Sequence, residues 1–269
     1  AGNPVLLGGW RHAVKHPGNY RTRVGPQMSD TRRMLAEMVD PFFAGMGAAA
    51  TVERDVARLE ELGLLDLLVP EAEGGFGGSW LDALTVFRLA GYHALGIDLP
   101  KLIITRAAVA DTELAMAFAR ACQIAGALDA ALALSIAYAN ERQQFGRPLG
   151  KFQAVQQSLA SFACEAAAAN CAAMGAAQAL DRGNAEFEVA AAKLRANRAV
   201  EMGTSVAHQV HGAIGFTEEY ALAPLPRRLW QGRSEYGNDA CWSARLGSKV
   251  IARGADRFWP DLSARTDHS

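Results

Sequence analysis

The feature that most constrains the fold is a series of long, alanine-rich segments in the second half of the chain, separated by short turns. The segments cover residues 111–142, 151–181 and 186–210, and the last one carries Lys193 on its predicted polar side. Alanine has the highest helix propensity of all residues. After the first turn, apolar residues follow the spacing of one helix face, namely Phe152, Val155, Leu159, Phe162 and Ala163. We therefore predict long helices that pack closely through small faces, as in a helical bundle.

Composition excludes several functional classes. The formal net charge is −1 and 20% of the residues are charged, which is typical of a globular protein and not of a general nucleic-acid binder. No apolar run reaches the length of a membrane span, so we expect none. None of the four cysteines forms a C-x-x-C pair, so we expect no zinc or dithiol site, and buried free thiols in a reducing compartment, the cytoplasm. The cysteines are Cys122, Cys164, Cys171 and Cys241.

The first residues differ from the rest of the chain. Residues 1–27 contain several basic and no acidic residues, and Met28 begins a stretch that resembles a natural start. We interpret 1–27 as a leader or tag without regular structure; the alternative is a basic arm that contacts a partner or an anionic ligand. The predicted division is then a helical domain over 28–105, a helical-bundle domain over 106–260, and a frayed tail over 261–269.

Polar side chains gather around the turn between the first two alanine-rich segments. Gly146, Pro148 and Gly150 break the helix. Arg142 offers a planar fork of donors suited to phosphate, and nearby glutamines can both donate and accept hydrogen bonds. A solvated hairpin between two helices is the alternative interpretation.

The order of residues at this turn resembles the signature of the acyl-CoA dehydrogenase family. The string RQQFGRPLGKFQAVQQ contains an R-x-x-F-G turn followed by F-Q-x-x-Q. In that family the arginine and glutamine contact the pyrophosphate and adenosine side of FAD held by a neighbouring subunit. The resemblance assigns this role to Arg142, Gln144, Phe145 and Gln153.

A second motif supports the same resemblance. The stretch from Gln209 to Tyr220 reads QVHGAIGFTEEY, and its glycines allow a ligand to approach the backbone closely. In the family the corresponding segment wraps the adenosine end of FAD from the adjacent subunit, which implicates Gln209, His211, Gly212 and Ala213. The alternative is a simple helix end with a glycine cap. His211 has no second ligand at helical spacing, so we predict no metal site.

The segment ELGLLDLLVPEAEGGFGG resembles the N-terminal region of the family, where a glycine-rich loop lies near substrate and flavin. Family members then insert a whole β domain before the C-terminal helices. Residues 97–111 are too few for such a domain and suit a helix–helix connection. We therefore predict an all-α fold in which the middle β-barrel domain is absent and a C-terminal four-helix bundle is retained.

The catalytic base is harder to place. In the family a carboxylate removes the proton alpha to the thioester while hydride passes to the flavin. The two usual base positions fall on Tyr236 and Met116, neither of which is a carboxylate. Glu235, one residue early, is the first candidate, and Glu113, one turn before Met116, is the second. The alternative for Glu235 is a surface carboxylate that pairs with Arg233 or a helix N-terminus.

Two functions of different classes follow. The first is an acyl-CoA dehydrogenase-type flavoprotein subunit that oxidises an acyl-CoA to its enoyl-CoA, with FAD shared between subunits of a homo- or hetero-oligomer (dimer or tetramer) and electrons passed to an electron-transfer flavoprotein. The second is a catalytically silent helical partner of a heteromeric acyl-CoA dehydrogenase, or an interaction protein. The Arg-Arg-Leu-Trp segment near the end resembles subunits of heteromeric members that act on steroid side chains.

Overall fold

The computed structural model describes residues 29–46 and 52–266, and this part of the chain is almost entirely helical. A two-stranded antiparallel hairpin interrupts the helices, formed by β1 (Gln143–Gln144) and β2 (Arg147–Pro148). The predicted all-α class is therefore confirmed, and no β domain occurs within the described ranges. The α-helices are α1 (Asp30–Ala44), α2 (Val52–Glu61), α3 (Trp80–Tyr92), α4 (Leu99–Arg106), α5 (Thr112–Glu141), α6 (Gln153–Asp181), α7 (Glu186–His211), α8 (Pro224–Ser234), α9 (Asp239–Arg253) and α10 (Ala255–Thr266).

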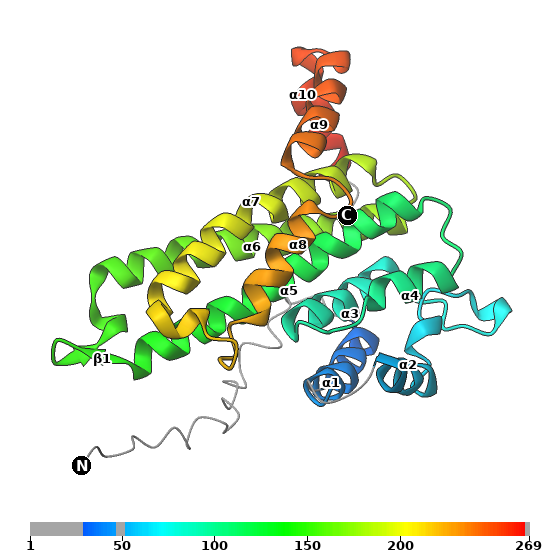
Figure 1. Cartoon of the computed structure of the whole chain (residues 1–269). Helices are drawn as coiled ribbons and strands as arrows, with labels where there is room; N and C mark the ends of the chain where they lie inside the picture. The colour runs from blue at the N-terminus through cyan, green and yellow to red at the C-terminus, as the bar shows by residue number, and fades with distance from the viewer. Residues whose placement is uncertain (1–28, 47–51, 267–269) are drawn as a thin grey trace.

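Three long helices, α5, α6 and α7, pack side by side, and α8 lies across them (Figure 1). The alanine-rich faces are the reason, because small side chains let helix axes approach one another. A Cβ atom added at Gly203 of α7 would lie 2.5 Å from Leu128 of α5 and 2.8 Å from Phe162 of α6. Many of the alanines of α5 and α6 are buried between these helices.

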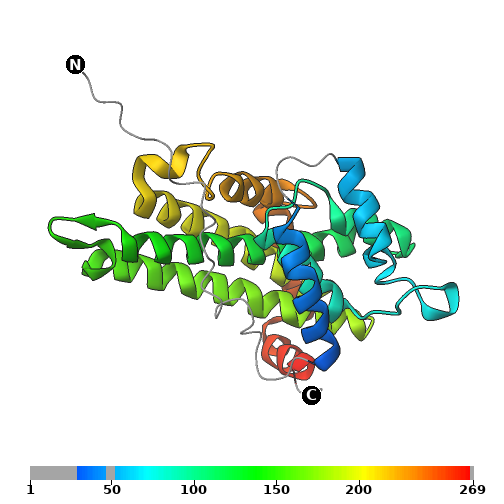
Figure 2. The ribbon, with the colours of Figure 1, turned by 90° about the horizontal axis from the view of Figure 1, so that it is seen from below.

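The N-terminal helices join the bundle through a close crossing of α3 and α5. A Cβ atom at Gly126 would lie 1.8 Å from the carbonyl oxygen of Arg88, and one at Gly91 would lie 2.0 Å from that of Gln123. The two backbones thus touch where both helices carry glycine. Seen from below, α1 lies against α3 (Figure 2).

Helices α9 and α10 project away from the bundle (Figure 1). Trp242 anchors α9: its side chain is buried, and its indole N–H donates to the carbonyl of Tyr236 at 3.0 Å. Gly254, with φ of 84°, makes the turn into α10. Helix α10 is held mainly by ion pairs, and its Trp259 is 69% exposed.

Several segments differ from the sequence prediction. Helix α4 occupies part of the predicted connection 97–111, because Asp98 caps its first turn and proline is tolerated there. Helix α8 begins at Pro224 without a side-chain cap, and its prolines are likewise tolerated in the first turn. Helix α10 extends to Thr266, so residues 261–266 are helical and not frayed. The predicted leader, 1–27, lies outside the described residues.

Two further expectations need correction. Cys122 is buried, but Cys164, Cys171 and Cys241 are exposed, so the thiols are not generally buried. Helix α5 is long and apolar enough to cross a membrane by length and composition, with a mean hydropathy of 1.4 in its most apolar window. Within the structure 67% of that window is buried, as in the core helix of a bundle.

Candidate functional site

The two sequence motifs meet at one end of the bundle. The first spans the end of α5, the β hairpin and the start of α6; the second covers the end of α7 and a 3-10 turn over Gly212–Phe216. Aromatic contacts join them, because the ring of Tyr138 on α5 lies 4.7 Å from that of His211 and 6.3 Å from that of Tyr220. We call this region the open end, defined by Arg142, Gln144, Phe145, Gln153, Gln209, His211, Gly212 and Ala213.

Polar side chains of the open end point to solvent. Among the residues that the structure describes, none forms a side-chain hydrogen bond or ion pair with Arg142, Gln144, Gln153 or Gln209, and all four are exposed. Phe145 is 90% exposed and has φ of 53°, an unusual backbone conformation for a large residue. The open end therefore presents a cation and three amides that no side chain of the described residues binds, together with an exposed aromatic ring that lies 6.2 Å from the ring of Phe152.

The second motif combines a buried histidine with open backbone. His211 is 3% exposed, and its Nδ1 lies 2.8 Å from the carbonyl oxygen of Ala207, so this nitrogen carries the hydrogen. Burial lowers the pKa of His211, and its Nε2 has no partner in the described ranges. Gly212 ends α7 with φ of 60°, and no atom lies within 4 Å of the position a Cβ would take. Gly212 therefore both caps the end of α7 and leaves the backbone accessible to a ligand.

The donor set of the open end fits the group that the resemblance implies. A guanidinium and amides suit a pyrophosphate, an exposed ring can stack on a base, and an open glycine lets a ligand approach the main chain. The unpartnered imidazole nitrogen of His211 adds a buried acceptor beside them. FAD contains both a pyrophosphate and an adenine base.

The candidate base lies elsewhere, among buried charges. Glu235 follows the last residue of α8, and one of its oxygens pairs with the guanidinium of Arg120 while the other accepts from Gln231 at 2.7 Å. Arg120 also donates to both oxygens of Asp98, at 3.0 and 2.6 Å. Burial alone would lower the pKa of Arg120, but the hydrogen bonds and charges of Asp98 and Glu235 outweigh it and raise that pKa. The alternative considered for Glu235, a pair with Arg233, does not form, since Arg233 binds Asp239 at 2.8 Å.

Lys193 stabilises the turn that carries Glu235 through hydrogen bonds to its backbone. It is fully buried, which corrects its predicted place on the polar side of its helix. Its ammonium donates to Asn197 at 2.7 Å and to the carbonyls of Gly232 at 2.8 Å and Gly237 at 3.2 Å. Burial lowers the pKa of Lys193 to about 7. We call Asp98, Arg120, Lys193 and Glu235 the charged centre.

The charged centre leaves little space for a ligand. A cavity of about 130 Å³ is lined by Asp98, Arg120 and Glu235, together with parts of α3 and α8. Glu113 is exposed in the first turn of α5 and is not among the lining residues. At the two usual base positions, Met116 is buried, and Tyr236 has φ of 51° with its ring 5.4 Å from the guanidinium of Arg120. The structure therefore does not bring Glu113 and Glu235 together.

Sequence reasoning missed Arg120, Asp98 and the role of Lys193. One available signal was the isolated arginine in the apolar run AMAFARACQIAG, since a charge inside a core helix requires a partner. The identity of that partner depends on tertiary packing.

Comparison with known proteins supports the family resemblance. The family model described as acyl-CoA dehydrogenase, C-terminal domain, matches residues 103–238. Glutaryl-CoA dehydrogenase from Desulfococcus multivorans is 42% identical over 104 residues, 38% of this chain and 27% of that protein. Acyl-CoA dehydrogenase FadE34 from Mycobacterium tuberculosis is 28% identical over 258 residues, 88% of this chain and 36% of that protein. The chain thus spans roughly a third of the length of these relatives.

The FadE34 alignment bears on the missing β domain. The alignment has 258 positions and covers 88% of this 269-residue chain. The few unmatched positions cannot hold a domain inserted into the aligned part of FadE34. A solved structure of the ChsE4–ChsE5 complex from Mycobacterium tuberculosis has the same helical fold, with a TM-score of 0.76 and 14% identity, over 85% of this chain and 99% of that one.

Proposed function

Because the chain belongs to the acyl-CoA dehydrogenase family, we propose that it is a flavoprotein subunit that acts in the FAD-dependent α,β-dehydrogenation of an acyl-CoA thioester. Its contribution is to hold the pyrophosphate and adenosine part of a FAD that it shares with another subunit. The observation that supports this most directly is the open end, where Arg142 and the glutamines of both motifs are exposed and have no side-chain partner in the described chain.

Each residue of the open end has a role in this proposal. Arg142 binds the pyrophosphate through charge-assisted hydrogen bonds, and Gln144, Gln153 and Gln209 donate to or accept from the ribose and adenine. Phe145 stacks against the nucleotide, and Gly212 lets it approach the main chain. When bound, FAD accepts the hydride that leaves the substrate.

The exposed position of these groups implies a second subunit. A ligand held only by the open end would remain half in water, so a partner must cover its other side. A homo- or hetero-oligomer provides that cover. Electron-transfer flavoprotein is the proposed acceptor of the electrons.

A FAD titration of the purified chain tests the proposal. Flavin absorbance and the molar ratio of flavin to chain are measured for the unaltered protein, for Arg142→Glu, and for Lys101→Glu as a charge-matched surface control on α4. We expect Arg142→Glu to weaken FAD binding at least about tenfold, because a charged hydrogen bond contributes about 1.5–3 kcal/mol, and Lys101→Glu to change it less than twofold. A chain that stays colourless with excess FAD, alone and in its assembly, contradicts the proposal.

A second candidate is a catalytically silent partner in such an assembly. The observation in its favour is the state of Glu235, whose two oxygens are already held by Arg120 and Gln231. The adjoining cavity of about 130 Å³ is also smaller than the roughly 300–1,000 Å³ of ordinary ligand pockets. To act as a base, Glu235 would have to leave Arg120 when substrate enters.

Turnover of the assembled enzyme separates the two candidates. If Glu235 removes the alpha proton, Glu235→Gln lowers kcat by about 10²–10⁴-fold, the usual contribution of a general base. If the chain is silent, kcat stays within a few fold and FAD content is unchanged. Gln231→Met is a useful companion, because it removes the hydrogen bond from Gln231 to Glu235, adds no charge and leaves the carboxylate in place.

A further inference from the structure

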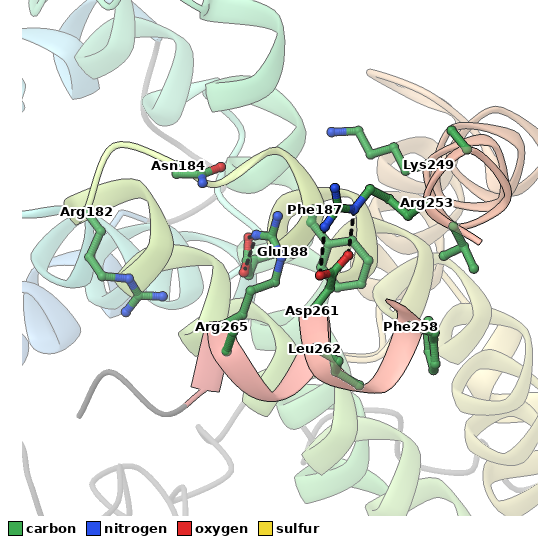
Figure 3. A pocket seen from close by; sticks show the side chains of 13 residues that line it. Arg182, Asn184, Phe187, Glu188, Lys249, Arg253, Phe258, Asp261, Leu262 and Arg265 are labelled. Carbon is green, nitrogen blue, oxygen red and sulfur yellow. Dashed lines mark hydrogen bonds and ion pairs between the residues drawn. The ribbon is translucent and has the colours of Figure 1, made fainter. Parts of the chain in front are cut away.

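A second cavity lies at the other end of the bundle. It has a volume of about 610 Å³ and is bounded by the start of α7, the end of α9 and α10 (Figure 3). From Phe187 in this cavity to Gln209 in the open end, α7 rises by about 33 Å at 1.5 Å per residue. The cavity is therefore separate from the proposed flavin contacts, and its volume lies within the range of small-molecule pockets.

The walls of this cavity are partly apolar and partly cationic. Phe187, Val250, Phe258 and Leu262 supply the larger apolar surfaces. The charged lining residues are four cations and two acids, which leaves an excess of positive charge: Arg182, Lys249, Arg253, Arg265, Glu188 and Asp261. Such a mixture suits a molecule with an apolar body and a negative group.

Most of these charges already have partners. Arg253 binds Asp261 through two hydrogen bonds of 2.7 and 2.9 Å, and Arg265 binds Glu188 at 2.9 and 3.1 Å. Lys249 pairs with Glu186. Within residues 29–46 and 52–266, no acid pairs with Arg182, so its guanidinium is the cation left to bind an added anion.

The surroundings of Arg182 also favour negative charge. Asn184 lies beside it in the turn before α7, and both lie on one side of the cavity with Phe258 on the other (Figure 3). Helix α7 begins at Glu186 without a side-chain cap, and the two acids of its first turn, Glu186 and Glu188, are paired with cations. The uncapped amide groups of that turn therefore add to the positive field there. A ligand would thus meet positive charge at one side and aromatic surface at the other.

We propose that this cavity binds a small amphipathic monoanion, with its anionic group on Arg182 and Asn184 and its apolar body against Phe187, Phe258 and Leu262. A carboxylate on a short alkyl chain has this chemistry. The bound molecule would connect α10 to the bundle, which it otherwise joins mainly through ion pairs.

Calorimetric titration with sodium octanoate tests the site, with octyltrimethylammonium as a probe of the same apolar length and opposite charge. We expect saturable binding of octanoate with a dissociation constant below about 1 mM, a plausible value for so few heavy atoms. The cationic probe should bind at least tenfold more weakly.

Two variants locate the binding. Arg182→Glu reverses an exposed charge and should weaken octanoate binding at least tenfold, whereas the control Lys101→Glu should change it less than twofold. Leu262→Trp places a bulky ring where the apolar body of the ligand would lie and should weaken binding. Absence of saturable binding to the unaltered chain, equal binding of both probes, or an unchanged affinity in Arg182→Glu would each overturn the proposal. Since Arg182 is exposed, its variant keeps the test decisive even if Leu262→Trp folds poorly.

Discussion

The open end and the charged centre share helices α5 and α7, yet their polar groups are treated in opposite ways. At the open end, exposed side chains such as Arg142 and Gln153 have no partner in the described chain. In the charged centre, Arg120 and Lys193 are buried and bound by carboxylates, an amide or backbone carbonyls. The first arrangement leaves its donors and acceptors open, and the second satisfies them within the described chain. A polar residue in an alanine-rich helix can thus be left open to solvent or be enclosed by partners, and only the second state stabilises the fold.

The largest difference should appear when an arginine is removed from each region. Arg120→Met leaves Asp98 and Glu235 without their cation. Each of these side chains is about a third exposed, 38% and 31%, so the cost should lie near the lower end of that for breaking a buried pair, about 3 kcal/mol. Arg142→Met should cost less than about 0.5 kcal/mol, as for an ordinary surface change. Chemical denaturation of both variants measures the contrast, and equal losses would erase it.

A smaller effect should follow from pH, through Lys193. Burial lowers its pKa in the folded state to about 7, whereas an unfolded lysine titrates near 10.5. Between these values the unfolded chain binds more protons, so stability rises with pH. The gain from pH 7 to pH 9 should be about 2 kcal/mol, since each unit contributes at most about 1.4 kcal/mol.

The matched comparison for this pH effect is Lys193→Met, which has no titratable group at that position. Denaturation curves of both proteins at pH 7, 8 and 9 remove the contribution of other groups. If the two proteins show the same pH dependence, Lys193 is protonated throughout and the charged centre solvates it better than its burial implies.

The smallest effect should come from Glu235→Gln. The amide oxygen can still accept a hydrogen bond, but the charge that faces Arg120 is lost, so we expect a cost of about 1 kcal/mol. Asp98→Asn is the matched variant on the other side of Arg120. Similar losses of unfolding free energy would show that the two carboxylates contribute equally to holding Arg120. A Glu235→Gln protein that is more stable than the unaltered chain would indicate that the charge of Glu235 destabilises the fold and is kept for another purpose.

The sequence predicted features whose causes lie within one segment better than features that depend on tertiary packing. The long helices were predicted because alanine content and apolar spacing act within a segment. The residues of the open end were proposed from two short motifs, and their role in binding stays a prediction. Helices α4 and α8 were missed, since their first turns contain proline and resemble loops. The charged centre was not predicted, because residues 98, 120, 193 and 235 meet only after α4, α5, α7 and α8 have packed. Burial of Lys193 depends on carbonyls some 40 residues away.

The glycine crossing of α3 and α5 has a consequence for how the chain unfolds. Because the backbones meet at Gly91 and Gly126, with side chains of both helices in one core, separation of α3 exposes the same surface as opening of the bundle. The N-terminal helices and the bundle should therefore melt in a single cooperative transition and not as two independent units. In folding terms the described residues should behave as one foldon with a projecting arm, α10, because Trp242 ties α9 to the core whereas no residue of α10 belongs to it.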